Sequence, residues 1–139
     1  MDLKLELVVL PVTDVDRAKD FYEKAGFRVD VDHRAGETFR VVQLTPPGSE
    51  CSITIGTGVT PSAPGSAQGL HLVVTDIEAA RDDLVARGVD VSKPFHFGPE
   101  GQIEGVDPQR QDYGTFASFA DPDGNGWLLQ EVRNRAPGR

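Results

Sequence analysis

The 139-residue sequence has little cysteine and few basic residues, and each shortage excludes a class of protein. The single cysteine, Cys51, excludes an internal disulfide and any metal cluster built from cysteines. Only 14 Lys and Arg stand against 22 Asp and Glu, which leaves a net charge of −8. A surface of that sign repels nucleic-acid phosphates and anionic lipids, so we expect neither nucleic acid nor membrane as a partner.

The sequence also lacks long apolar runs. None approaches the roughly 20 residues that a membrane-spanning helix needs. The first four residues show no basic region that leads into an apolar stretch, as a signal peptide would have. The hydrophobic fraction of 38% is low for a globular domain but too high for a disordered chain. We therefore expect a soluble, cytoplasmic protein of one domain.

Residues 1–57 alternate between the period of a strand and the period of a helix. Residues 3–10 are apolar at every second position and then on both faces, which predicts a strand. Asp14 is a favourable N-cap and Gly26 a favourable C-terminal residue for a helix over residues 15–25. Further strands are predicted from residue 27, over 39–44 and over 51–55. The predicted order is βαβββ.

The same pattern returns after a linker rich in Gly, Ser, Thr and Pro. With a shift of 62, the tripeptide at residues 12–14 is identical to that at 74–76, and Gly26 aligns with Gly88. Because the helix caps coincide as well as the strands, we infer a duplicated module. The second copy predicts a strand from residue 89, a long loop over 94–112, a strand over 113–120, a tight turn over 121–125 and a last strand over 127–132. A loop of that length in a small domain is typical of a lid or a binding element.

These elements predict one α+β domain over residues 1–139. Its parts are a first module over about 1–57, a linker over about 58–68, a second module over about 69–133 and a short basic tail over 134–139.

Two stretches resemble one known family: residues 10–22, which read LPVTDVDRAKDFY, and residues 121–125, which read DPDGN. Together with the two βαβββ modules they are similar to the vicinal oxygen chelate superfamily, also called the glyoxalase / bleomycin resistance protein / extradiol dioxygenase family. The resemblance implies two half-barrels, each with its helix outside and a ligand cavity inside, and a homodimer. It leaves the chemistry open, because this family includes metal-dependent lyases, epimerases and dioxygenases as well as drug-sequestering proteins without a metal.

The resemblance also implies where metal ligands would stand. The first is a His seven residues before the helix-capping Asp, where this chain has Leu7 in the first module and Gly69 in the second. The last is a Glu three residues after the Asn of the turn, where this chain has Leu128. Residues 52–56 hold no counterpart of the remaining Glu. Leu and Gly side chains cannot coordinate a metal, so we predict no metal cofactor.

One unusual metal site stays open as an alternative, made of His33, His71 and Glu131. Glu131 stands three residues after Leu128, so on a regular strand the two side chains point to opposite faces. The alternative therefore needs a bulge in the last strand.

The remaining polar and aromatic residues supply candidates for ligand binding. His71 aligns with Val9 in the repeat and shares the inward parity of Leu7. It is a candidate to bind a ligand or to move a proton as a catalytic residue, and the alternative is a histidine whose hydrogen bonds are satisfied by its neighbours. The other candidates are Gln43, Gln130, Tyr113, His33, His96 and Phe39. For His33 the alternative is an exposed strand end, and for His96, between two phenylalanines, it is an anchor for the loop.

We therefore predict a metal-free protein that binds a small organic molecule and is similar to the antibiotic-sequestering branch of the family. The inward apolar set is Leu7, Val9, Val41 and Leu128, which predicts a ligand with a large apolar or aromatic portion. The acidic charge favours a cationic one. The alternative is a glyoxalase-like enzyme, a lyase, isomerase or dioxygenase, with a non-standard or metal-independent site.

Overall fold

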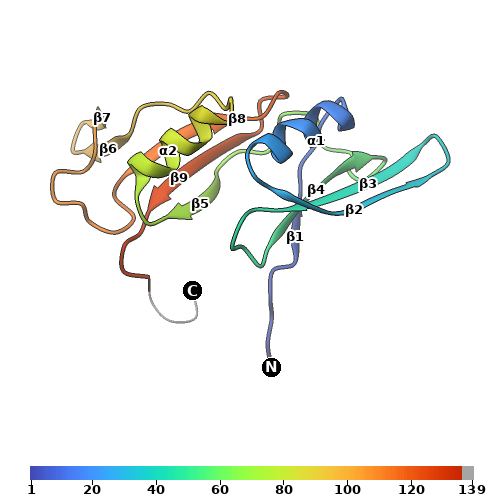
Figure 1. Cartoon of the computed structure of the whole chain (residues 1–139), viewed down its shortest axis with the longest axis horizontal. Coiled ribbons are helices and arrows are strands. Elements are labelled where there is room, and N and C mark those ends of the chain that lie inside the picture. Colours follow the sequence, from blue (N-terminus) through green and yellow to red (C-terminus); the bar gives the residue numbers. More distant parts are fainter. Residues whose placement is uncertain (136–139) are drawn as a thin grey trace. The chain divides into compact units, whose positions relative to one another are not determined.

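The structure, a computed structural model, describes residues 1–135, and the chain divides into two compact units (Figure 1). Unit 1 holds Met1–Gln68 together with the turn Asp121–Asn125, and unit 2 holds Gly69–Ala120 and the described chain from Gly126. Residues 136–139 of the predicted tail lie outside the described part. Each unit consists of one sheet and one helix, so the predicted α+β class is confirmed. No helix of the described chain is long and apolar enough to cross a membrane.

Unit 1 has the order βαβββ. Its elements are β1 (Leu7–Val9), α1 (Val15–Lys24), β2 (Arg28–Ala35), β3 (Phe39–Thr45) and β4 (Ser52–Thr57). The sheet order is β1-β4-β3-β2, with β1 parallel to β4 and the other pairs antiparallel. Helix α1 begins where the Asp14 side chain accepts a hydrogen bond from the backbone N–H of Arg17 at 3.0 Å. It ends before Gly26, whose φ of 101° is a conformation that glycine adopts without a steric penalty.

Unit 2 repeats this plan with one additional strand. Its elements are β5 (Leu70–Val74), α2 (Ile77–Ala86), β6 (Phe95–Gly98), β7 (Gly101–Glu104), β8 (Phe116–Ala120) and β9 (Gly126–Glu131). The sheet order is β5-β9-β8-β6-β7, and the first and last strands of the unit again pair in parallel. The Asp76 side chain caps α2 by accepting the backbone N–H groups of Glu78 and Ala79, each at 3.1 Å.

Each sheet has one face under its helix and one face turned away from it, which we call the open face. In unit 1, Val42 and Leu44 of β3 lie on the helix side and are fully buried, so the alternating Val41 and Gln43 lie on the open face. By strand register, the open face of unit 1 carries Leu7, Val9, His33, Phe39, Val41, Gln43 and Thr54, and that of unit 2 carries His71, Val73, Phe116, Leu128 and Gln130. All four members of the predicted inward apolar set therefore lie on open faces.

The first strand is shorter than the sequence predicts. Only Leu7–Val9 pairs with β4, and the side chains of Leu3 and Leu5 are 87% and 69% exposed. The ladder cannot extend toward Leu3, because β4 itself begins only at Ser52. Alternation of apolar residues predicts a strand, but a strand also needs a neighbour with which to pair.

The predicted loop over residues 94–112 contains a hairpin. Strands β6 and β7 pair antiparallel, joined through Gly98 and Gly101, and Phe95 of β6 also pairs with Phe116 of β8. The hairpin thus extends the sheet of unit 2. The alternation of Phe, His and Phe at residues 95–97 is a strand signal, which the surrounding glycines and proline masked.

Two other predicted strands differ in extent. No strand forms at Val89 or Val91, although both side chains are only 3% exposed and belong to the core. Strand β8 begins at Phe116 rather than at Tyr113.

The turn Asp121–Asn125 packs with unit 1 through hydrogen bonds of buried side chains. The hydroxyl of Tyr22 in α1 donates to Asp121 Oδ2 at 2.9 Å, and Asn125 Nδ2 donates to the carbonyl oxygen of Pro11 at 2.9 Å. Asp121 Oδ1 also accepts the backbone N–H groups of Asp123 and Asn125. Both carboxylate oxygens of Asp121 are therefore used to fix the turn and the helix.

Candidate functional site

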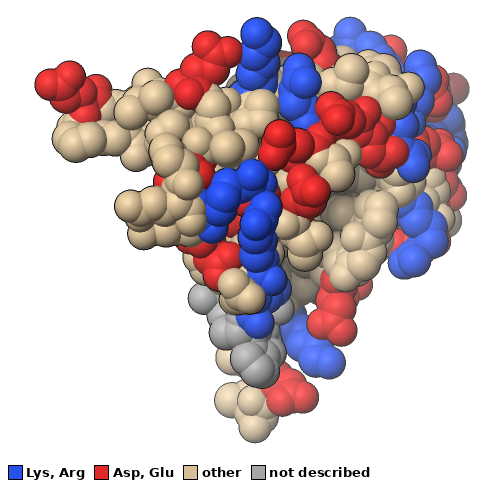
Figure 2. Space-filling model, turned by 60° about the vertical axis from the view of Figure 1, so that its left-hand side comes forward, with Lys and Arg blue, Asp and Glu red and all other residues tan. Residues whose placement is uncertain are grey.

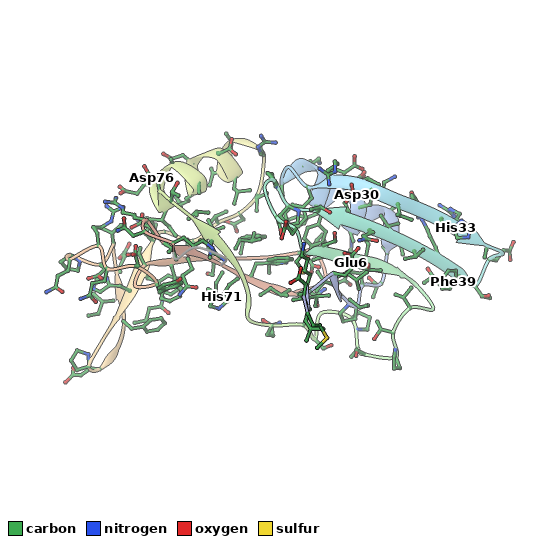
Figure 3. The ribbon with its side chains drawn as sticks, turned by 90° about the horizontal axis from the view of Figure 1, so that it is seen from below. Glu6, Asp30, His33, Phe39, His71 and Asp76 are labelled. Carbon is green, nitrogen blue, oxygen red and sulfur yellow. The ribbon has the colours of Figure 1, made fainter. Side chains whose placement is uncertain are left out.

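His71 lies on the open face of unit 2 and is exposed (Figure 3). The parallel pairing of β5 with β9 sets His71 beside Leu128, and Gln130 follows on the same face. His71 Nδ1 and Gln130 Oε1 are 2.9 Å apart, which makes a hydrogen bond. The structure thus joins two residues that the sequence nominated separately.

Gln130 is held in turn by the backbone of Tyr113. Its Nε2 donates a hydrogen bond to the carbonyl oxygen of Tyr113 at 3.1 Å. Tyr113 has a φ of 68°, and its own N–H donates to the carbonyl oxygen of Glu131 at 2.8 Å. The sequence predicted a role for the Tyr113 ring; in the structure it is the backbone carbonyl of Tyr113 that contacts Gln130.

Three phenylalanines, which we call the aromatic cluster, lie beside His71: Phe95, Phe97 and Phe116. The Phe95 and Phe116 rings stack with centroids 5.9 Å apart, and Phe97 meets Phe116 edge to face at 5.5 Å. The His71 ring meets Phe116 nearly perpendicularly at 6.3 Å. Phe97 is 60% exposed, so the cluster offers aromatic surface next to the imidazole. Sequence analysis placed Phe95 and Phe97 beside His96 in a loop, and missed both Phe116 and the hairpin that carries the first two.

His96 does not join that site. It alternates with Phe95 and Phe97 along β6, so its side chain points to the opposite side of the hairpin. Its Nδ1 lies 2.8 Å from the carbonyl oxygen of Gly105, a contact that ties the hairpin to the following loop.

The remaining candidates lie on the open face of unit 1 (Figure 3). Gln43 is half-buried on β3, and its Nε2 donates to Glu6 Oε2 at 3.3 Å. His33 lies on the edge strand β2 opposite Val41 and is exposed, and Phe39 at the start of β3 is 39% exposed. His33 and Phe39 thus stand toward the hairpin end of the sheet.

Polar groups that the sequence did not nominate also lie on this open face. The Thr45 hydroxyl hydrogen-bonds to Asp30 and to the hydroxyl of Ser52, the latter at 2.7 Å. Thr54 is 4% exposed, and its Oγ1 has no hydrogen-bond partner among the described residues. An unsatisfied buried hydroxyl is uncommon in a folded protein.

Glu131 lies on the helix side of unit 2 and is 1% exposed. Arg110 donates to both of its oxygens, at 3.0 and 2.7 Å, and the backbone N–H of Ile77 donates at 2.9 Å. The hydrogen bonds from Arg110 hold the pKa of Glu131 below its ordinary value, against the opposing effect of burial. Glu131 is therefore an ionised anchor for the start of α2.

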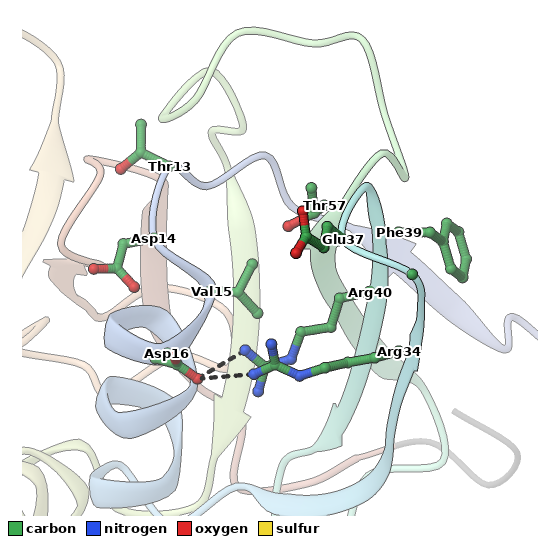
Figure 4. A pocket seen from close by; sticks show the side chains of 10 residues that line it. Thr13, Asp14, Val15, Asp16, Arg34, Glu37, Phe39, Arg40 and Thr57 are labelled. Carbon is green, nitrogen blue, oxygen red and sulfur yellow. Dashed lines mark hydrogen bonds and ion pairs between the residues drawn. The ribbon is translucent and has the colours of Figure 1, made fainter.

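A second charged network lies beside the start of α1. Arg40 donates to both oxygens of Asp32, at 3.0 and 2.9 Å, and to Asp16 at 2.7 Å. Hydrogen bonds from Arg40, and then from Lys19, hold the pKa of Asp32 well below its ordinary value. A shallow depression of about 470 Å³ opens here (Figure 4), into which Arg34 also extends. Because Asp16 and Asp32 already bind the Arg40 guanidinium, this depression offers little free positive charge to a ligand.

The residues present do not fit a metal site of the kind the family implies. Leu7 and Leu128 stand at two of the expected ligand positions, and Gly69 at a third. Glu131 cannot replace them on the open face, because β9 pairs regularly with both neighbours and Glu131 is held on the helix side by Arg110. Among residues 1–135, no group of three or more His, Cys, Asp and Glu is arranged to hold a metal ion.

The surface charge is interspersed on the face shown in Figure 2, where Lys and Arg lie beside Asp and Glu. Arg87 and Asp83, for example, form an exposed ion pair at 3.2 Å. Cys51, half-buried, is not an activated thiol: burial, and then the nearby charge of Glu6, raise its pKa.

Comparison with known proteins assigns the fold to a family. Residues 4–129 match the model of the Glyoxalase/Bleomycin resistance protein/Dioxygenase superfamily. The chain belongs to this superfamily. Its two units are accordingly glyoxalase-like modules, as the sequence motifs predicted. The uncharacterized protein YetH of Bacillus subtilis (strain 168) is 30% identical over 126 residues, which cover 89% of this chain and 94% of that protein.

Solved structures similar to this chain include that of an antibiotic binding protein. TnmS3, described as an antibiotic binding protein from Streptomyces sp. CB03234, is 33% identical, with a TM-score of 0.72 and coverage of 94% of this chain and 97% of that one. A member from Sphaerobacter thermophilus DSM 20745 is 29% identical, with a TM-score of 0.70 and coverage of 94% and 98%.

Proposed function

We propose that this glyoxalase-superfamily chain binds a small organic molecule with a large apolar or aromatic portion, and does so without a metal. The observation that carries the proposal is the open face of unit 2, where aromatic surface adjoins one hydrogen-bonding group, His71. Apolar walls with a few fixed polar groups are typical of small-molecule sites. The description of TnmS3 as an antibiotic binding protein supports the same class of activity.

The proposal disfavours a small dianionic metabolite as ligand. On strands β5, β8 and β9, the open-face positions carry no Lys or Arg among the described residues. A phosphate or dicarboxylate buried there would lack the charged partner that stabilises it.

A thermal-shift screen tests the proposal directly. A specific ligand raises the melting temperature by mass action, because it binds the folded chain only. We expect shifts with aromatic compounds and none with phosphorylated or dicarboxylate metabolites. His71→Ala should reduce the shifts, whereas Arg87→Ala, on the exposed end of α2, should leave them unchanged. Shifts confined to the anionic metabolites would overturn the proposal.

The metal-free part of the proposal has its own test. Elemental analysis of protein purified without chelators should find no stoichiometric Mn, Fe, Ni or Zn. A molar equivalent of any of them would contradict it.

A second candidate function is a metal-independent enzyme of the same superfamily. It is favoured by the exposed His71, whose ring is oriented by Gln130 as a general base would need to be. Turnover that is abolished by His71→Ala while binding persists would select this candidate over sequestration.

A homodimer and a cytoplasmic location complete the proposal. The small sheet of each unit and the single cysteine support them. Sedimentation should give a species of about twice the chain mass of 15.0 kDa; a 15.0 kDa species at micromolar concentration would contradict the dimer.

A further inference from the structure

The hydrogen bonds around Gln130 determine which nitrogen of His71 carries the proton. An amide NH₂ only donates and a backbone carbonyl only accepts, so Gln130 Nε2 must be the atom that faces the Tyr113 carbonyl at 3.1 Å. Gln130 Oε1 then faces His71 Nδ1 at 2.9 Å. If the Gln130 amide were flipped, its oxygen would face the carbonyl oxygen of Tyr113, and both atoms are acceptors.

The oxygen of Gln130 only accepts, so the proton on the neutral imidazole is on Nδ1. The second ring nitrogen, Nε2, therefore carries a lone pair and acts as an acceptor. Among the described residues no hydrogen bond to Nε2 of His71 is formed, and the residue is exposed. The carbonyl of Tyr113 thus orients Gln130, and Gln130 in turn makes Nε2 of His71 a hydrogen-bond acceptor for a ligand.

The surroundings of His71 restrict the ligand further. Phe116 lies against the ring at 6.3 Å, and Phe97 continues the aromatic surface. Along β5, β8 and β9 the open face carries no carboxylate in the described chain. On the outer strand β7, Glu104 forms an ion pair with Lys93 at 3.7 Å. A cationic group would therefore lack a free counter-charge here, whereas a neutral aromatic hydroxyl needs none.

We propose that the ligand is an aromatic hydroxyl compound, of the phenol or naphthol class, whose O–H donates to Nε2 of His71 while its ring lies against the aromatic cluster. This inference rests on the proposed function, because it specifies the ligand of the same site. Ligands that offer only acceptors at this position, such as ethers and ketones, meet a lone pair and are rejected.

The experiment compares a matched pair of probes, 1-naphthol and its methyl ether 1-methoxynaphthalene, which differ in the O–H donor. Equilibrium dialysis against the wild-type chain should give a dissociation constant about fivefold to tenfold lower for 1-naphthol, the value of one hydrogen bond between neutral groups. Gln130→Leu frees Nδ1 from its acceptor and should reduce this preference to less than about twofold. Gln109→Leu, which makes the same change at an exposed loop residue, should leave the preference intact.

The tautomer is read independently by ¹⁵N NMR of the histidine ring, above the titration range of histidine. We expect the Nδ1–H form for His71 in the wild type and a shift toward the Nε2–H form in Gln130→Leu. Since the wild-type measurement needs no substitution, it decides the matter even if the variant fails to fold.

The outcomes separate the two proposals. Equal binding of both probes, or an Nε2–H tautomer in the wild type, overturns the inference and leaves the proposed function standing. If neither probe binds, and no other aromatic compound binds, the proposed function is overturned and the inference with it.

Discussion

Units 1 and 2 repeat one pattern in sequence and topology, yet they differ in what anchors the helix. In unit 1, α1 is tied to the turn Asp121–Asn125 by the hydrogen bond from Tyr22 to Asp121 at 2.9 Å. In unit 2, the start of α2 is held by Glu131, an ionised carboxylate that Arg110 neutralises. The first anchor is one hydrogen bond to a charged group, and the second is a buried ion pair. We therefore expect the two anchors to differ in strength and in response to pH.

The open faces differ as well. That of unit 1 carries paired polar groups, such as Gln43 with Glu6 and Thr45 with Ser52, whereas that of unit 2 carries the aromatic cluster and His71. Neither helix packs on an open face. The apolar periodicity and the caps that specify helix and sheet therefore do not determine which side chains stand on the open faces. The repeat therefore determines the scaffold, and the chemistry resides in the residues that the scaffold leaves free.

The largest effect is expected from Arg110→Met, which removes the guanidinium but keeps an apolar chain. The Glu131 carboxylate, 1% exposed, would retain the Ile77 N–H and Arg133, whose Nε lies 3.5 Å away. Removal of one partner from a buried ion pair destabilises a protein by about 3 kcal/mol. Urea unfolding at neutral pH should show this loss. Arg87→Met, which breaks an exposed pair with Asp83, should change stability by less than about 0.5 kcal/mol.

The same variant should alter the pH dependence of stability. Because hydrogen bonds from Arg110 lower the pKa of Glu131, the pair stabilises the fold above the ordinary pKa of Glu, and this contribution is lost as pH falls through the lowered folded value. The difference between wild type and Arg110→Met should therefore be largest at neutral pH and shrink as acidification passes through the lowered folded pKa of Glu131. A difference that stays constant on acidification would mean that Glu131 is not the charge involved.

A smaller effect is expected in unit 1 from Asp32→Asn. The change removes one of the two oxygens that Arg40 contacts and turns an amide toward its guanidinium, but Arg40 keeps Asp16 at 2.7 Å. We expect a loss of about 2 kcal/mol, less than in unit 2, because an acidic partner remains. Asp83→Asn, at an exposed pair, is the matched control. A loss equal to that of the control would show that the contact between Arg40 and Asp32 does not stabilise unit 1.

Periodicity and caps predicted both helices, because Asp14 and Asp76 satisfy helix N–H groups within their own turn. They also predicted the open-face parity of Leu7, His71 and Leu128, since parity needs only the strand period. Local patterns were therefore sufficient for local structure.

The parts that sequence did not predict depend on distant partners. The bond between His71 and Gln130 spans 59 positions, and that between Arg110 and Glu131 spans 21. Arg110 also has a φ of 48°, which no sequence pattern indicates for an arginine. The exposed Leu3 shows the converse, a strand pattern without a neighbouring strand.

Tyr22→Phe should have a smaller effect still. It removes the hydroxyl that donates to Asp121, which is 5% exposed, while the carboxylate keeps three donors from Asp123 and Asn125. The expected loss is about 1 kcal/mol, the contribution of one hydrogen bond to a group that stays otherwise satisfied. Thermal unfolding of the variant tests this, and a loss as large as that of Arg110→Met would show that the two helices are anchored with equal strength.

The smallest effect, and one of opposite sign, is expected from Thr54→Val on the open face of unit 1. The Thr54 hydroxyl is buried without a hydrogen-bond partner in the described chain, so its replacement by a methyl group of similar shape removes an unsatisfied group. We expect a gain of about 0.5 to 1 kcal/mol in chemical denaturation. Thr45→Val is the matched control: Thr45 is buried on the same face, and its hydroxyl bonds to Asp30 and, at 2.7 Å, to Ser52. That variant should lose about 1 kcal/mol, because both partners would be left without it. Equal losses of stability from the two substitutions would show that the Thr54 hydroxyl forms a hydrogen bond in solution, as the Thr45 hydroxyl does.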